Sequence, residues 1–189
     1  MTEAAAKAIE QKTKNLLEVL KRLDVYIGTT NTKCAVVMSY CAAVIGLTTL
    51  LISRAGTDIS HPEFLVFIGL LSTMVFASSV ACMWMAISVI FPVTFSSPKK
   101  HVGNSVIFFG DISATGNTPS KYCEKIRDIS DAAFLDDLSD QVFTLSKIVS
   151  EKFDRIKILS WCLMWLNFIP TAILLIGCVI YSINSRGLF

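Results

Sequence analysis

Side chains that could carry out chemistry are scattered along this 189-residue chain and form no catalytic pattern. The two histidines, His61 and His101, flank a long apolar run on opposite sides. Asp136, Asp137 and Asp140 could mimic a carboxylate metal site, but acidic residues are also favoured at the start of a helix. The motifs of serine hydrolases, P-loop proteins, zinc proteases and dinucleotide-binding folds are absent. We therefore predict no enzyme, no catalytic residue, no metal and no cofactor.

The composition indicates a membrane protein. Hydrophobic residues make up 53% of the chain and charged residues 17%, with a mean hydropathy of +0.59. A soluble domain usually has about 25% charged residues. The net charge of +2, without a dense basic face, argues against nucleic-acid binding. No Cys-x-x-Cys or Cys/His spacing appears, so we interpret the six cysteines as reduced, with all but Cys123 as small apolar residues inside hydrophobic runs.

Three segments match the length of a membrane-spanning helix, which needs about 20 apolar residues. They are residues 34–53, 64–91 and 160–183, and none contains Asp, Glu, Lys or Arg. Trp161 and Tyr181 lie near the two ends of the third segment, as interfacial aromatic residues do. Because transporters usually carry charged residues at depth, these charge-free spans argue against an ion or substrate path.

Lysine and arginine residues alternate across the three spans. Six precede the first span, one lies between the first two, nine lie between the second and third, and one follows the third. The positive-inside rule therefore places the N-terminus and the long middle segment in the cytoplasm. We predict a multi-pass protein of the inner membrane with a periplasmic C-terminus.

The polar segments are predicted to be mainly helical. Residues 1–30 form an amphipathic helix, with one apolar stripe that packs on this chain's own cytoplasmic helix or on another subunit: Ile9, Thr13, Leu16, Leu20, Leu23 and Ile27. Residues 94–158 contain a β-prone segment at Val106–Phe109, a helix that starts at Thr118-Pro119, and a helix capped by Ser130. No helix breaker separates Asp131 from Trp161, so we expect this last helix to continue into the third span.

The predicted fold is therefore an all-α membrane protein with three transmembrane helices, a helical cytoplasmic portion and a short β-prone segment. In the third span, Asn167 and Pro170 are the main polar or irregular residues, and we interpret Asn167 as a link between helices. Small residues at Ala42/Gly46 and Ala77/Ala81 allow close helix packing, either within the chain or between chains.

A group of polar and aromatic residues near the cytoplasmic membrane surface could bind a nucleotide. Lysine can meet a phosphate, an aromatic ring can stack on a base, and Asn or Gln can read a base edge. The alternative is a solvated basic rim that faces lipid headgroups. The candidate ligand-binding residues are Asn31, Lys33, Asn104, Phe108, Phe109, Asp111, Gln141, Lys147 and Lys152.

Three stretches of this chain resemble the transmembrane effectors of Pycsar anti-phage defence, which are related to membrane effectors of CBASS operons. They are Asn31-Thr32-Lys33-Cys34, residues 104–112 (NSVIFFGDI), and residues 134–147 (FLDDLSDQVFTLSK) followed by Lys152-Phe153. The order of these stretches between the spans carries the resemblance, which extends over residues 10–180. One departure is Asn31, where the family pattern has Asp.

The resemblance implies a function that composition does not. Such effectors sense cyclic UMP or cyclic CMP made by a partner pyrimidine nucleotide cyclase, then damage the inner membrane so that the cell dies or stops growing before phage spreads. It also implies contact with membrane lipid and assembly into a homo-oligomer, with the ligand bound by the small cytoplasmic portion. The alternatives are a holin-like protein, which would be toxic on expression alone, and a scaffolding subunit that needs a partner chain.

Overall fold

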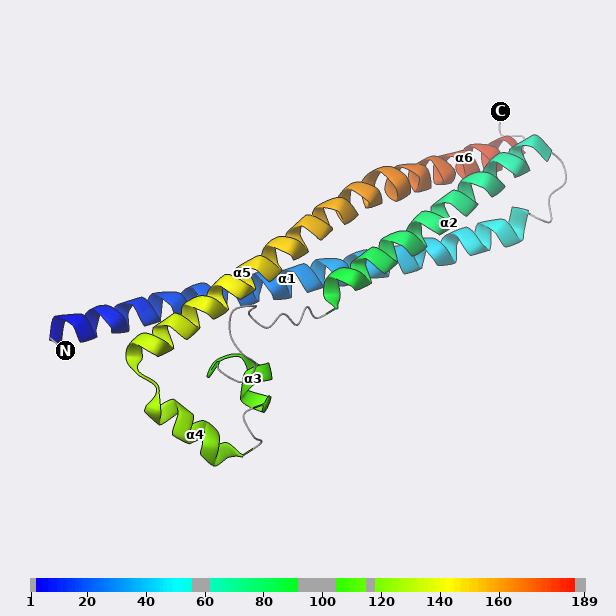
Figure 1. The fold of residues 1–189 in the computed structure, drawn as a ribbon. Helices are drawn as coiled ribbons and strands as arrows, with labels where there is room; N and C mark the ends of the chain where they lie inside the picture. Colours follow the sequence, from blue (N-terminus) through cyan, green and yellow to red (C-terminus); the bar gives the residue numbers. More distant parts are fainter. Residues whose placement is uncertain (1–2, 56–61, 92–104, 115–117, 186–189) are drawn as a thin grey trace. The chain divides into compact units, whose positions relative to one another are not determined.

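The computed structural model describes residues 3–55, 62–91, 105–114 and 118–185, and every regular element in these ranges is a helix (Figure 1). This confirms the predicted all-α fold. The elements in chain order are α1 (Glu3–Ala55), α2 (Pro62–Ile90), α3 (Phe109–Ala114), α4 (Pro119–Asp128), α5 (Asp131–Cys162), the π-helix η1 (Leu163–Phe168) and α6 (Ile169–Ser185).

The chain divides into two compact units. The polar unit comprises residues 1–29 and 92–152, and the membrane unit comprises residues 30–91 and 153–189. Most of the charged residues belong to the polar unit. Two helices contribute to both units, because α1 contains the predicted amphipathic helix 1–30 together with the span 34–53, and α5 begins in the polar unit.

The first part of α1 is amphipathic, as its sequence predicts. All six residues of the apolar stripe, from Ile9 to Ile27, are half-buried. Ion pairs at i, i+4 spacing join Lys7 to Glu3 and Lys14 to Glu10, each at 2.8 Å between nitrogen and oxygen. Because these pairs are exposed, they contribute only tenths of a kcal/mol, and burial of the stripe stabilises this segment more.

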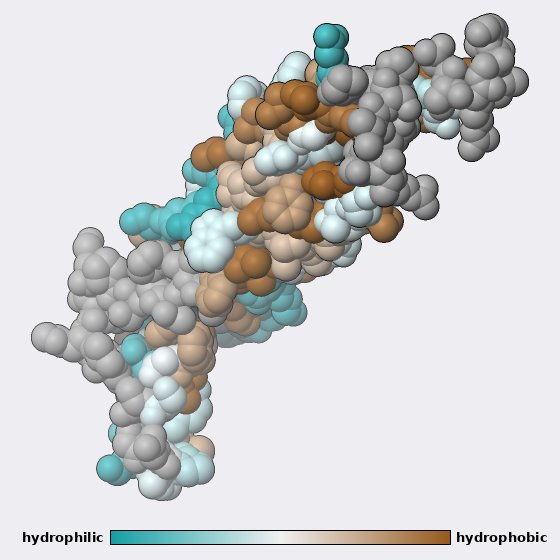
Figure 2. Space-filling model, turned by 90° about the vertical axis from the view of Figure 1, so that its right-hand side faces the viewer, coloured by the Kyte–Doolittle hydropathy of each residue, from teal (hydrophilic) through white to brown (hydrophobic). Residues whose placement is uncertain are grey.

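Three helices are long and apolar enough to cross a membrane, as predicted. Their most apolar 18-residue windows are only 17%, 28% and 22% buried within the protein. Large apolar side chains therefore point outward, for example Val36, Leu70 and Trp84 at 65%, 70% and 73% exposed. Figure 2 shows one such face, where hydrophobic side chains cover the surface of the spanning helices. Contact with a lipid bilayer would be favourable for this apolar surface, whereas exposure to water would be unfavourable.

Small side chains form the core of the membrane unit. Cys34, Cys41, Cys82, Ala86, Val89 and Leu159 pack together from α1, α2 and α5. All six cysteines are free thiols, and Cys123 is exposed on α4. The pairs Ala42/Gly46 and Ala77/Ala81 face away from this core and are exposed. They therefore do not serve packing within the chain.

The third span continues from the polar unit without a loop, as predicted, but it is not uniformly α-helical. Residues from Asp131 to Ser185 are helical throughout, with the π-helical segment η1 between α5 and α6. The Ile169 N–H donates to the Met164 carbonyl, five residues earlier. Pro170 follows directly, and proline has no N–H and crowds the preceding turn. A wider π turn relieves this crowding, which explains its position.

The predicted β-prone segment Val106–Phe109 is not a strand. Residues 105–108 form a bend, and α3 begins at Phe109. A strand needs a neighbour to accept its backbone hydrogen bonds. Here side chains satisfy the backbone N–H groups instead, and they define the candidate site.

Candidate functional site

The candidate site is centred on Ser105 and Val106, which are 3% and 2% exposed. The Asp137 carboxylate from α5 accepts hydrogen bonds from the Ser105 hydroxyl at 3.0 Å and from the Val106 N–H at 2.9 Å. Asp137 is itself only 2% exposed. Hydrogen bonds to a buried carboxylate are stronger than neutral ones. They tie the bend to a helix that lies about 30 residues further along the chain.

The Ser105 side chain organises the rest of the bend. Its oxygen accepts hydrogen bonds from the N–H groups of Ile107 at 3.1 Å and Phe108 at 2.9 Å. The Ser105 N–H donates to the Asp111 carboxylate at 3.0 Å. Gln141 of α5 approaches the same hydroxyl at 3.5 Å. The four consecutive N–H groups from 105 to 108 are therefore all satisfied by side chains.

Helix α4 closes the other side of the bend. Thr118 has an extended backbone and Pro119 is the first helical residue, as predicted, although Thr118 makes no side-chain capping bond. The Tyr122 hydroxyl donates to the Val106 carbonyl at 2.9 Å, and the Lys125 ammonium approaches the Ser105 carbonyl at 3.4 Å. We call Ser105, Asp111, Tyr122, Lys125, Asp137 and Gln141 the anchor network.

The start of α5 is fixed by its own cap. The Ser130 hydroxyl accepts a hydrogen bond from the Ala133 N–H at 3.3 Å, which confirms the predicted N-cap. Asp131 lies in the first turn, where its charge suits the helix dipole. Asp137 and Gln141 are four residues apart and therefore share the face of α5 that contacts Ser105.

Two aromatic rings stand beside the anchor network. The ring centroids of Phe108 and Phe109 are 4.8 Å apart and their planes are tilted by 52°. Phe109 is 68% exposed, whereas Phe108 is half-buried. Gly110 leaves room for the Phe108 ring, since a Cβ at this position would lie 2.6 Å from it. The half-buried ring of Phe108 thus supports the exposed ring of Phe109.

The structure brings together some of the predicted site residues. Asp111, Gln141 and Phe108 all contact Ser105 through hydrogen bonds. Lys147 is exposed on α5, and Lys152 is buried at 5% exposed. Asn31 and Lys33 belong to the membrane unit, where Asn31 is half-buried and Lys33 is exposed. Asn104 lies outside the described residues.

Sequence reasoning missed four members of the network: Ser105, Tyr122, Lys125 and Asp137. Ser105 and Asp137 lie in two of the three stretches that carry the family resemblance, so their positions were a usable signal. Asp137 was instead interpreted as one of several acids at a helix start. Nothing in the local sequence distinguishes Tyr122 or Lys125 from ordinary surface residues.

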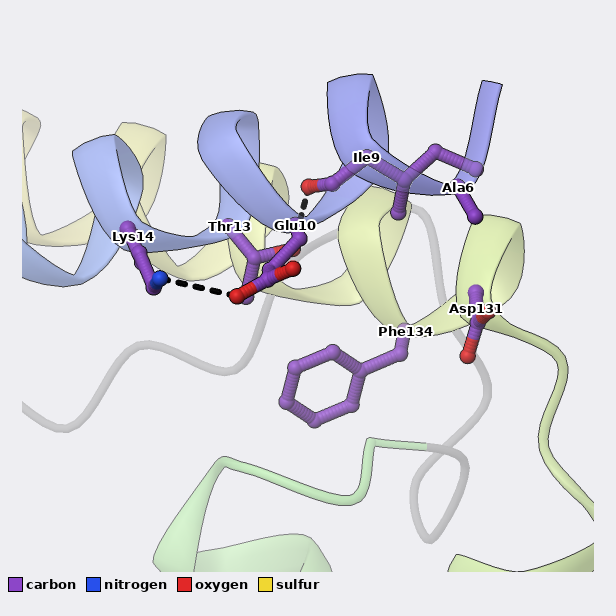
Figure 3. A pocket seen from close by; sticks show the side chains of 7 residues that line it. All are labelled: Ala6, Ile9, Glu10, Thr13, Lys14, Asp131 and Phe134. Atoms are coloured by element: carbon purple, nitrogen blue, oxygen red, sulfur yellow. Dashed lines mark hydrogen bonds and ion pairs between the residues drawn. The ribbon is translucent and has the colours of Figure 1, made fainter. Parts of the chain in front are cut away.

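A cavity of about 500 Å³ lies between α1 and the start of α5 in the polar unit (Figure 3). Its lining comprises Ala6, Ile9, Glu10, Thr13, Lys14, Asp131 and Phe134. Ile9 belongs to the predicted apolar stripe of α1 and Phe134 lies on α5, which supports packing of this stripe on the chain's own helix. The Lys14 ammonium hydrogen-bonds Glu10 and lowers the pKa of that carboxyl. The lining has two acids, Glu10 and Asp131, and its one lysine is already paired. This charge distribution disfavours an anionic ligand in the cavity.

The chemistry of the anchor network is structural. Its carboxylates accept hydrogen bonds from backbone and hydroxyl groups, and its lysine faces a carbonyl oxygen. Within the described residues, no group of three or more His, Cys, Asp or Glu side chains could hold a metal ion. This arrangement holds a short segment in place, and the Ser105 hydroxyl that donates to Asp137 is itself buried, at 3% exposed.

The family model described as the Pycsar effector protein domain matches residues 15–181 of the chain. This chain belongs to the Pycsar effector family. The match includes the whole anchor network, the first two spans and the third span up to residue 181, whereas the five α1 residues of the cavity precede it. Comparison with curated proteins and with solved structures gave no match.

Membership assigns the general role of this Pycsar effector. It is an anti-phage defence effector with membrane-spanning helices, and it acts with a cyclic-nucleotide signalling partner. It is an effector and does not belong to a known enzyme family. Because the cavity residues on α1 lie outside the matched region and the anchor network lies within it, the anchor network is the better candidate for the family's shared function.

Proposed function

We propose that this Pycsar effector senses cyclic UMP or cyclic CMP, made by a partner pyrimidine nucleotide cyclase, and then impairs the integrity of the inner membrane. The infected cell would stop growing or die before phage spreads. The family supports the general role. The sensing and the membrane damage are the steps that we add.

One observation carries this proposal. Helix α5 bears Asp137 and Gln141 of the anchor network near its start, and it continues through η1 into α6, the third span. A ligand that changes how residues 105–108 are held would therefore act on a helix that reaches the membrane. A ligand shifts such an equilibrium only if it binds the two states with different affinity.

For the ligand site, we propose that the exposed members of the predicted set in the polar unit make direct contact. Phe109 offers a ring for stacking on a pyrimidine, and Lys147 offers an ammonium group for the cyclic phosphate. Asp111 and Gln141 would help to position Phe109 through Ser105. In a single chain, a ligand bound to these exposed groups would remain open to solvent. We therefore place the ligand between subunits of a homo-oligomer.

The face of α1 that would join such subunits has small residues throughout the span. The exposed residues at alternating spacings of three and four are Thr32, Ala35, Ser39, Ala42, Gly46, Thr49 and Ser53. Small side chains allow helices to approach closely in a membrane. A Cβ added at Gly46 would meet no atom of this chain within 4 Å, so a neighbouring helix has room there.

Two features support the proposed placement of the spans: the first marks the depth of an interface, and the second fits an orientation in which α1 enters from the cytoplasm. Leu159 packs with Ala86 and Val89, so Trp161 and Trp84 lie at similar depth, where both are exposed as an interfacial belt requires. Arg155 donates to the Ser88 carbonyl at 3.2 Å, in the last turns of α2. An arginine at this level fits the basic, cytoplasmic side of the bilayer.

Co-expression with and without a pyrimidine nucleotide cyclase tests this function in cells. The proposal predicts normal growth with the effector alone and growth arrest when the cyclase is active. A catalytically dead cyclase is the matched control and should leave growth normal. Toxicity of the effector alone would instead favour a holin-like protein.

A further inference from the structure

Four side-chain oxygens inside the membrane unit are buried and have no hydrogen-bond partner among the described residues. They are the Tyr40 hydroxyl on α1, Ser72 Oγ on α2, Asn167 Oδ1 on η1 and Thr171 Oγ1 on α6. Ser72 and Asn167 are 0% exposed, and Thr171 is 6% exposed. Buried polar atoms without a partner are rare, and inside a bilayer no bulk water reaches them.

The orientation of the Asn167 amide follows from its neighbours. Its Nδ2 approaches the Val75 carbonyl at 3.3 Å, Ser78 Oγ at 2.9 Å and Ser79 Oγ at 2.7 Å. Both serine hydroxyls donate their protons to the Val75 carbonyl, at 2.9 Å each. Since the serines can then only accept, the amide must present its N–H groups to α2. Its oxygen therefore points to a place where no described group donates.

The other unpartnered hydroxyls lie next to this contact. Ser72 is one turn from Val75 on the same face of α2, and Thr171 is one turn from Asn167 along the helix. α2 and α6 run in opposite directions (Figure 1). Ser72 and Thr171 therefore lie on the same side of the contact between Val75 and Asn167, towards the same end of the bundle. The Tyr40 hydroxyl is close enough to Thr171 to interact with it, although the two form no hydrogen bond of good geometry, and the Tyr40 ring lies 6.4 Å from that of Phe168.

The backbone supplies a further acceptor that needs a hydrogen-bond donor. Pro170 has no N–H, so a carbonyl in the preceding turn lacks the donor that a regular helix supplies. In membrane helices, ordered water commonly satisfies groups freed in this way. The π-helical segment η1 thus brings the Asn167 amide and a carbonyl freed by Pro170 into one short stretch of the chain.

We propose that this cluster is a binding site for ordered water inside the membrane bundle, held by Asn167 Oδ1, Ser72, Thr171 and Tyr40. Water suits the chemistry because one molecule donates two hydrogen bonds and accepts others, and the amide oxygen requires a donor. A cation suits it less, since no acidic side chain lies in the spans to balance the charge. The bound water joins α1, α2 and α6 at the point where the third span departs from α-helical geometry.

Substitutions that remove single hydroxyls test the proposal, because the direction of the change in stability depends on whether water binds these oxygens. If these oxygens have no partner, replacing them with apolar groups of similar size is neutral or stabilising; if water binds them, the replacement loses hydrogen bonds. In purified full-length protein in lipid nanodiscs, Thr171→Val and Ser72→Ala should each lower Tm by about 2–4 °C. The control Thr73→Val removes an exposed hydroxyl that donates to its own helix, to the Gly69 carbonyl at 2.8 Å, and should leave Tm unchanged. An unchanged or higher Tm for both test variants would overturn the proposal.

Water-edited solid-state NMR of the protein in lipid provides a direct readout that does not depend on a variant. Magnetisation should pass from water to the Thr171 side chain quickly. It should reach Thr48 slowly, because Thr48 is 0% exposed and its hydroxyl bonds to the Val44 and Ile45 carbonyls. Equally slow transfer to both threonines would show that the cluster is dry and would refute the site.

Discussion

Asp137 holds the backbone of Val106 from across 31 residues of sequence, with a hydrogen bond of 2.9 Å from the Val106 N–H to the Asp137 carboxylate. The same oxygen accepts the Ser105 hydroxyl at 3.0 Å. Through these two bonds a segment without regular structure becomes fixed to the helix that continues into the third span. The proposed coupling between a ligand and the membrane therefore depends on this contact.

Asp137→Asn tests the anchor directly. The variant keeps the side-chain size but loses the charge, so unfolding of the polar unit should require about 2 kcal/mol less free energy. Denaturant unfolding followed by circular dichroism measures this change. The neighbouring Asp136 is exposed on the same helix, and Asp136→Asn should change stability by less than about 0.5 kcal/mol. Equal effects of the two variants would contradict the role given to Asp137.

Lys147→Ala should weaken the response to nucleotide without reducing expression. Loss of one charge-assisted hydrogen bond to a phosphate predicts about a tenfold rise in the half-maximal nucleotide concentration. Lys157→Ala, at another exposed lysine of the same helix, is the matched control and should respond normally. If Lys147→Ala responds like the parent protein, the basic part of the proposed site is wrong.

Gly46→Leu should disrupt assembly between chains. A leucine there enlarges the small-residue face of α1 without touching the chain's own core, since Gly46 has open space around it. Ala43→Leu is the control, because Ala43 lies on the adjacent exposed ridge with Val36 and Leu50. Size-exclusion chromatography with light scattering should show smaller particles only for the Gly46 variant. Unchanged assembly would place the interface elsewhere.

The ion pair between Glu10 and Lys14 predicts a small pH dependence. Lys14 lowers the pKa of Glu10 below its ordinary value of 4.5, by a hydrogen bond and by its charge. A carboxyl with a lowered pKa in the folded state stabilises that state above its unfolded pKa, and this stabilisation is lost as pH falls through the folded pKa. Carbon NMR titration should show the pKa of Glu10 return to its ordinary value in Lys14→Ala. No change would mean that the pair does not form in solution.

The spans, the apolar stripe of α1 and the long third helix were predictable because each depends on composition and helical period. The half-burial of Ile9 and Ile27 follows from the same period. Asn167 was correctly interpreted as a link between helices, because an isolated amide in an apolar run has few other stable environments.

The bend at residues 105–108 was not predictable from local propensity. Val106–Phe109 is β-prone, but the hydroxyl of Ser105 and the distant carboxylate of Asp137 satisfy its backbone better than a lone strand could. The π-helical segment was also missed. Pro170 marked an irregularity, but whether the helix kinks or widens depends on contacts such as that of Asn167 with α2.

The most direct test of the central claim is dye release from liposomes that contain the purified effector. Addition of cyclic UMP or cyclic CMP should start release, whereas cyclic AMP at the same concentration should not, and Asp137→Asn should reduce the release that the active nucleotide causes. Leakage that is the same with every nucleotide and with none would contradict a nucleotide-gated effector.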